Sequence, residues 1–178
     1  MTETRTTHDA HPPAAGLDGL NAADAGRLTP VLTDLSGSAA WARAIVDARP
    51  FPTVEALHTT ARDVLACQDD DEVIAAVDAH PPIGTSGPVS TASAREQSAA
   101  ARADADTARR LAEGQQRYAE HFGHGFLVCA TGLTAEQVLA EVRRRLALTP
   151  KQDLAATREH LARINALRLD HLLESGTL

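Results

Sequence analysis

Three residues of the sequence have side chains and surroundings that suit acid–base chemistry or anion binding. His80 lies in the motif AHPPIG, directly before two prolines that restrict the chain and hold the histidine in place. Glu96 lies in SAREQSA, within an alanine-rich stretch. Arg168 lies in INALRL, four residues after Ile164 and seven after Leu161, so it interrupts the apolar face of a helix. An arginine on such a face needs an anionic partner, because a buried unpaired charge is costly.

Each of these residues also has a purely structural interpretation. His80 could cap a helix or face solvent, Glu96 could be a solvated helix charge, and Arg168 could form a structural salt bridge or extend its head group to water. A metal site is a further alternative, since His121 and His124 have HxxH spacing. Glycines flank His124 and interrupt the helix that would present both rings, so the sequence disfavours metal binding.

The sequence contains none of the common cofactor motifs. It lacks both usual glycine-rich phosphate loops, HExxH and CxxC. Lys151 is the only lysine, and its position at the polar start of a helix makes it a poor Schiff-base residue. We therefore expect no cofactor and no metal, and any chemistry must come from ordinary side chains.

Composition restricts the class of protein. The chain has 178 residues, a formal net charge of −7 and 43% hydrophobic residues, which suits one compact domain. An excess of 24 Asp and Glu over 17 Lys and Arg disfavours nucleic-acid binding. No apolar run approaches the ~20 residues of a membrane span. With only Cys67 and Cys129, the sequence does not suggest a disulfide framework, and we expect a cytoplasmic protein. The C-terminal SGTL differs from a peroxisomal SKL signal, which favours a bacterial cytoplasm.

Hydrophobic periodicity predicts an all-α fold. Residues 1–15 are polar and contain prolines, which predicts a disordered leader before a single domain over residues 16–178. Within that domain the pattern predicts seven to nine helices and no sheet. The glycines of FGHGFLVCATG (122–132) interrupt the helical pattern around a short apolar run. Because one short run cannot form a sheet, we expect a buried extended segment there.

Capping residues and apolar spacing locate the individual helices. Two alanine-rich helices are expected over about 91–102 and 105–122. One helix that ends at Pro50 is predicted from a face made by Trp41, Ala44, Ile45 and Ala48. Other helix starts are predicted at Thr53, Asp70, Thr134 and Thr149.

Five motifs in this order resemble the 2-oxo-4-hydroxy-4-carboxy-5-ureidoimidazoline (OHCU) decarboxylase family. They are W-x7-RPF, AHPPIG, SAREQSA, Y-x3-FGHGFLVCATG and INALRL, and the resemblance covers about residues 17–174. It implies an all-helical homodimeric enzyme that converts OHCU to (S)-allantoin, the last step of urate degradation, without a cofactor. It also implies that His80, Glu96 and Arg168 are catalytic, with His80 as general acid and the other two orienting the substrate.

The resemblance further implies substrate contacts at positions beside these residues and in the extended segment. These positions are Pro81, Ser93, Ala94, Arg95, Gln97, Phe126, Leu127, Val128, Cys129 and Ala130. The chain departs from the family's pattern at Pro82, where many members have Asp or Arg, and in FGHGF, where others often have FGFPF.

Two other functions remain open on the sequence. The first is a non-enzymatic helical interaction module in which His80 and Arg168 are structural. The second is a related cofactor-free decarboxylase or lyase that acts on another ureido or carboxylated ring. The chemistry fits the absence of cofactor motifs, because a ring C=N beside the departing carboxylate can accept the electron pair that CO2 leaves behind.

Overall fold

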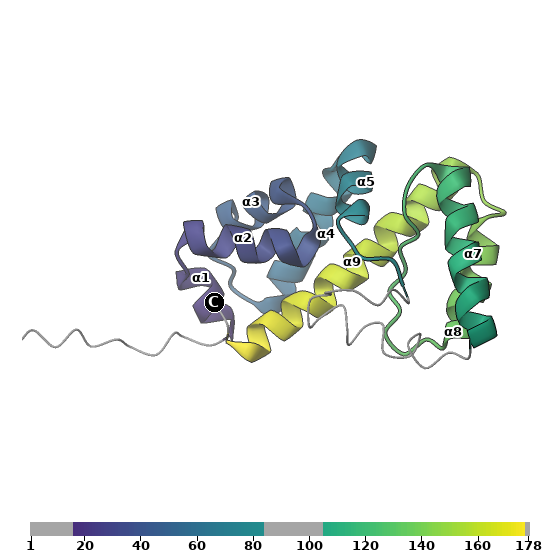
Figure 1. Cartoon of the computed structure of the whole chain (residues 1–178). Coiled ribbons are helices and arrows are strands. Elements are labelled where there is room, and N and C mark those ends of the chain that lie inside the picture. Colours follow the sequence, from purple (N-terminus) through teal and green to yellow (C-terminus); the bar gives the residue numbers. More distant parts are fainter. Residues whose placement is uncertain (1–15, 84–104, 177–178) are drawn as a thin grey trace, which may run out of the picture.

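The computed structural model describes residues 16–83 and 105–176, which fold into eight helices (Figure 1). The expected leader over residues 1–15 and the expected helix over 91–102 lie outside the described residues. The all-α prediction is confirmed, and the described part of the chain contains no strand. The helices are α1 (Gly16–Ala22), α2 (Ala25–Ser36), α3 (Ala39–Asp47), α4 (Val54–Cys67), α5 (Asp70–Asp78), α7 (Ala105–Phe122), α8 (Ala135–Arg145) and α9 (Pro150–Ser175).

Local sequence sets where these helices begin. The Thr53 side chain accepts the third backbone N–H of α4, as its capping position predicts. Thr134 and Gln137 form a reciprocal capping box at the start of α8, and Thr149 and Gln152 form another at the start of α9. These predicted starts are therefore confirmed at residue level.

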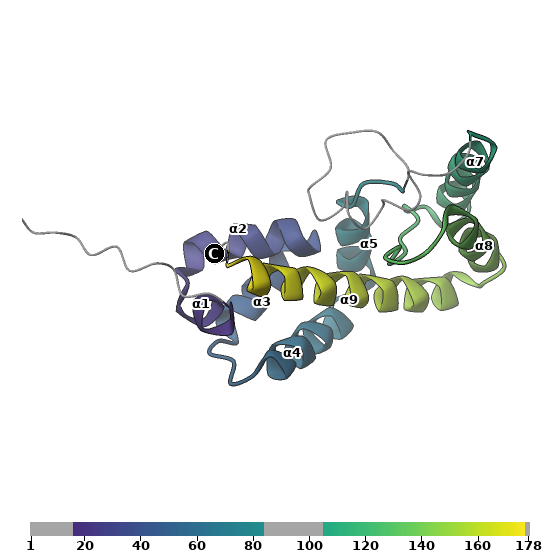
Figure 2. The ribbon, with the colours of Figure 1, turned by 90° about the horizontal axis from the view of Figure 1, so that it is seen from below.

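The long helix α9 connects two groups of helices. Helices α1 to α5 pack around one end of α9, and α7 and α8 lie side by side at its other end (Figures 1 and 2). The first group has a core around Trp41, Ile45 and Leu57, and the second has a core around Leu111 and Tyr118. One position predicted for the buried face of α3 is wrong: Ala48 lies just past the end of the helix and is exposed, because the buried face is turned toward Ala42 and Val46. None of the described helices is both long and apolar enough to span a membrane.

An extended segment, residues 125–130, runs between the two cores. Its side chains alternate, as expected for an extended chain with a period of two. Phe126, Val128 and Ala130 enter the core of α7 and α8, whereas Leu127 belongs to the core of α1 to α5 and Cys129 packs against it. The predicted buried extended segment is confirmed, and it reaches the place where both cores meet α9.

Candidate functional site

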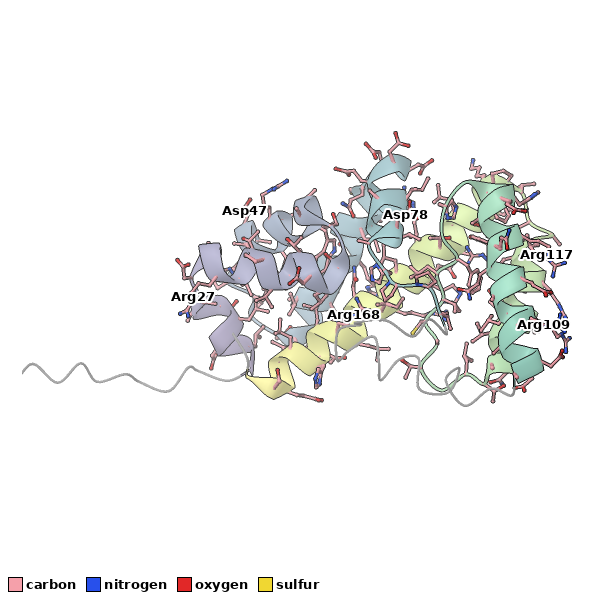
Figure 3. The ribbon with its side chains drawn as sticks, in the orientation of Figure 1. Arg27, Asp47, Asp78, Arg109, Arg117 and Arg168 are labelled. Atoms are coloured by element: carbon pink, nitrogen blue, oxygen red, sulfur yellow. The ribbon has the colours of Figure 1, made fainter. Side chains whose placement is uncertain are left out.

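His80 and Arg168 contact each other where α5 ends against the middle of α9. Arg168 is labelled on α9 in Figure 3. Its Nη1 lies 3.0 Å from Nε2 of His80 and donates a second hydrogen bond of 2.8 Å to the carbonyl of Leu35, in the last turn of α2. On the other side of the ring, Nδ1 lies 2.7 Å from the carbonyl of Ala76. A carbonyl can only accept, so Nδ1 carries the proton and Nε2 presents its lone pair to the guanidinium.

The inward direction predicted for Arg168 is confirmed, since only 8% of the residue is exposed. Among its hydrogen-bond partners are an uncharged carbonyl and an imidazole. His80 and Arg168 are 88 residues apart and come from different motifs, so their contact could not be predicted from neighbouring residues in the chain. The tertiary structure therefore brings together two of the three residues that the sequence singled out.

The loop after His80 is held by a residue that the sequence did not indicate. Pro81 and Pro82 have no N–H, so the next backbone donor is that of Ile83. The amide of Gln115 on α7 accepts this N–H at 3.1 Å and donates to the Ile83 carbonyl at 2.9 Å. Gln115 thereby fixes the exit of the loop that carries His80. No local pattern predicts this contact, because it joins two distant segments.

A cavity of about 430 Å³ opens beside His80. Pro82 and Ile83 form part of its wall, and alanines of α7 form another. Gly125 and Phe126 bring the start of the extended segment to the same cavity. The volume suits a small ligand, and the predicted catalytic histidine and part of the predicted substrate-binding segment both line it.

Three hydrogen bonds from residues distant in sequence hold the backbone of the extended segment at one edge. They are the Gly125 N–H to Asp78 Oδ1 (3.1 Å), Arg145 Nη1 to the Leu127 carbonyl (3.4 Å) and the Cys129 N–H to His160 Nδ1 (3.3 Å). The residues held by these three long-range bonds are all odd-numbered, and a local bond from the Leu133 N–H to the Ala130 carbonyl (3.0 Å) closes the end of the segment. In an extended chain the backbone groups of alternate residues point to opposite edges, so the even-numbered residues direct theirs away from these anchors.

Val128 illustrates the consequence of this anchoring. In a planar trans peptide the C=O and N–H point in opposite directions. Because the Leu127 carbonyl and the Cys129 N–H are both held by anchors, the N–H and C=O of Val128 point to the opposite edge. Val128 is only 4% exposed, and neither group has a hydrogen-bond partner among residues 16–83 and 105–176. A buried donor and acceptor in this state are suited to pair with an amide-like ligand.

A second buried arginine, Arg145, holds α7, α8 and α9 together. Its Nε lies 2.6 Å from Asp153 Oδ1, and its Nη2 bonds the hydroxyls of Tyr118 (2.8 Å) and Thr157 (2.5 Å). All four residues are completely buried. Burial and the hydrogen bond to Asp153 raise the pKa of Tyr118 above its ordinary value. No local pattern indicates this cluster, because Arg145 ends a run of three arginines that is typical of a solvated helix end.

The two histidines with HxxH spacing have different environments. His121 is exposed at the end of α7, and its ring packs edge-on against Phe122. His124 is buried: its Nδ1 is 3.0 Å from the Gly125 carbonyl and its Nε2 is 3.7 Å from Asp153. Within the described ranges, no three His, Cys, Asp or Glu side chains gather in a group that could hold a metal ion.

The remaining predicted site residues divide into two groups. Pro81 follows His80 in the chain, and residues 126–130 form the extended segment. The other five lie outside the described residues: Ser93, Ala94, Arg95, Glu96 and Gln97.

Comparisons with known proteins identify relatives of this chain. A "Uric acid degradation bifunctional protein TTL" from Arabidopsis thaliana is 31% identical over 144 residues, which is 76% of this chain and 44% of that protein. A "Uric acid degradation bifunctional protein" from Bacillus sp. (strain TB-90) is 22% identical over 130 residues, which is 72% of this chain and 26% of that protein. The chain therefore spans less than half the length of these curated relatives.

Two solved structures share the fold. A crystal structure of OHCU decarboxylase in the presence of (S)-allantoin superposes with a TM-score of 0.72 at 26% identity, covering 81% of this chain and 97% of that one. A crystal structure of (S)-allantoin synthase superposes with a TM-score of 0.69 over 88% of this chain and 53% of that one, and at 19% identity it supports the fold alone. The sequence profile of OHCU decarboxylase matches residues 21–170, which run from α1 into α9 and include both His80 and Arg168. The chain belongs to the OHCU decarboxylase family.

Proposed function

We propose that this protein decarboxylates OHCU to (S)-allantoin in urate degradation, using its own side chains and no cofactor. The observation that carries the proposal is the 3.0 Å contact between His80 and Arg168 beside a cavity of about 430 Å³. An arginine fork suits a planar anionic substrate, and a histidine suits proton transfer near neutral pH. Family membership and the solved structure with (S)-allantoin support the same assignment.

The reaction needs an electron acceptor and one proton transfer to carbon. When the C–CO2 bond breaks, its electron pair forms a double bond to the neighbouring ring carbon, and the C=N electrons move to the ring nitrogen, which takes a proton. The resulting enol loses its hydroxyl proton to become a carbonyl, and the carbon that bears the ureido group gains a proton. Delivery of that proton to one face gives the S product.

His80 is proposed to carry this proton on Nε2. Its Nδ1–H is held by the Ala76 carbonyl, so Nε2 is the nitrogen that exchanges protons with the ligand. Arg168 donates to that same nitrogen. An anionic substrate competes for the guanidinium, and when it binds Arg168 the lone pair of Nε2 is released to accept the enol proton before returning it to carbon. Glu96 is proposed to orient the hydroxyl or ureido group of the substrate.

The backbone edge of the extended segment is proposed to bind the amide groups of the substrate. The N–H and C=O of Val128 point away from the three anchors and form an adjacent donor and acceptor. A ureido group or a ring amide presents the complementary pair. Backbone recognition of this kind depends on the position of the chain rather than on the side chain.

A homodimer in a bacterial cytoplasm completes the proposal. The homodimer follows from the family resemblance, and the cytoplasm from the two cysteines, both of which are free thiols in the structure. Sedimentation of the purified chain measures the first directly.

The decisive experiment supplies freshly generated OHCU and follows allantoin formation by circular dichroism, which reports the S enantiomer. We expect rapid (S)-allantoin formation that exceeds the spontaneous reaction and persists after exhaustive chelation. Formation of racemic allantoin at the spontaneous rate would contradict the proposal. In that case, turnover of another ureido or carboxylated ring would identify the related lyase, and turnover of none would favour the interaction module.

A further inference from the structure

A histidine outside the His80–Arg168 pair holds the backbone of the extended segment. His160, on α9, accepts the Cys129 N–H on Nδ1 at 3.3 Å. Its Nε2 lies 3.6 Å from Oε1 of Glu141 on α8. We propose that His160 is a positioning residue that, as a neutral ring, orients the Val128 carbonyl toward the substrate. This inference rests on the proposed function, because it assigns a purpose to the backbone edge described there.

A single peptide plane connects His160 to the Val128 carbonyl. The Val128 carbonyl and the Cys129 N–H belong to the same planar unit and point in opposite directions. When His160 holds the N–H at one edge, the carbonyl oxygen is directed to the other. Arg145 holds the preceding plane through the Leu127 carbonyl. The two side chains thus fix consecutive peptide planes, but only His160 does so with a titratable acceptor.

The surroundings of His160 favour the neutral ring. Burial lowers its pKa, and the positive charge of Arg145 lowers it further. Arg163 on α9 acts in the same direction, whereas Glu141 on α8 raises the pKa. The Glu141 carboxylate is itself held by Arg144 through two hydrogen bonds of 2.7 Å. With Nδ1 accepting, the ring proton sits on Nε2, on the side of Glu141.

Protonation of His160 would break the anchor. The imidazolium carries a proton on both nitrogens, so Nδ1–H would face the Cys129 N–H as a second donor. The peptide plane would then turn, and the Val128 carbonyl would lose its direction. The expected consequence is weaker substrate binding at low pH.

Two substitutions at position 160 test this role. His160→Leu removes the acceptor, and we expect KM for OHCU and the dissociation constant of (S)-allantoin to rise by about 2–10-fold, the equivalent of one neutral hydrogen bond, with kcat less affected. His160→Asn places Oδ1 where Nδ1 lies, so it should restore the wild-type KM. His58→Asn is the control, because His58 pairs with Asp170 at the surface and not with the extended segment.

The pH dependence of KM distinguishes this role from a merely structural one. Because the pKa of His160 is lowered, KM in the wild type should rise only at pH values below the ordinary histidine pKa of about 6.5, and in His160→Asn this rise should be absent. Equal KM–pH profiles in the two proteins would overturn the proposal, and this comparison does not require His160→Leu to fold.

Hydrogen exchange of the Cys129 amide separates failure of this inference from failure of the proposed function. We expect slow exchange in the wild type and in His160→Asn, and faster exchange in His160→Leu. A wild type with a protected amide and no activity on OHCU would refute the function. An active wild type whose KM is unchanged by His160→Leu would refute the role of His160, as would an amide whose exchange rate does not respond to that change.

Discussion

The two buried arginines of this protein lie in contrasting environments. Arg145 is completely buried, and its guanidinium is bound to the Asp153 carboxylate and to hydroxyls at the junction of α7, α8 and α9. Arg168 is 8% exposed, and Nη1 bonds a carbonyl of α2 and the imidazole of His80. One arginine is compensated by a carboxylate within the core. The other contacts a group that can change its proton count beside a cavity.

This difference indicates how the same side chain serves stability in one place and chemistry in another. A buried arginine with a carboxylate and several hydroxyls keeps the fold together, because removing either charge leaves the other without compensation. An arginine that donates to a histidine nitrogen can exchange that neutral partner for an anion without reorganising the core. The following predictions test this contrast.

His80→Asn should give the largest effect, because it removes the group assigned to proton transfer. We expect (S)-allantoin formation to slow by about 10²–10⁴-fold, the usual contribution of a general acid or base. The melting temperature should stay within a few degrees of the wild type, since the ring is partly exposed beside the cavity. Near-normal turnover in this variant would remove His80 from the mechanism.

Arg145→Leu should destabilise the fold by about 3–5 kcal/mol, because it leaves the Asp153 carboxylate buried without its partner. Urea unfolding followed by the fluorescence of Trp41, the single tryptophan, measures this loss. Arg143→Leu is the matched control: Arg143 is exposed in the same arginine run, and its loss should cost less than about 0.5 kcal/mol. Similar losses in both variants would contradict the structural role of Arg145.

Arg168→Leu should show the opposite profile to Arg145→Leu. Activity should fall by about 10²–10³-fold and (S)-allantoin binding should be lost, as expected when a charged substrate-binding donor is removed. Stability should change by no more than about 1 kcal/mol, because leucine extends the apolar face of Leu161, Ile164 and Leu172. Thermal melts with and without (S)-allantoin separate the two roles. A loss of several kcal/mol with ligand binding preserved would identify Arg168 as a structural ion-pair residue.

Tyr118 should make stability fall at alkaline pH, a smaller effect. Its pKa is raised in the folded protein by burial and by its hydrogen bond to Asp153, so above about pH 10 the unfolded chain loses a proton that the native chain keeps. Stability is therefore complete below pH 10 and declines above it. Tyr118 is the only tyrosine, so tyrosinate absorbance reports it alone. Ionisation of the native protein near pH 10 would contradict the tight cluster around Arg145.

Much of the fold could be predicted because it depends on local sequence. The capping residues Thr53, Thr134 and Thr149 act within one helical turn, and their helices begin where predicted. The inward direction of Arg168 follows from its spacing relative to Leu161, which the geometry of one helix translates into a common face. The extended segment follows from glycines that interrupt a helical pattern. Each of these inferences needs only neighbours along the chain.

The tertiary structure alone decided which distant groups meet. The sequence contains three consecutive arginines at the end of α8, and only Arg145 is enclosed by partners from α7 and α9, while Arg143 remains exposed. Likewise, the 88-residue separation between His80 and Arg168 carries no signal of their 3.0 Å contact. His160 gains its role because the extended segment lies along α9 and presents one N–H to the ring. Local periodicity determines which face a residue occupies, whereas its partner depends on which element packs against that face.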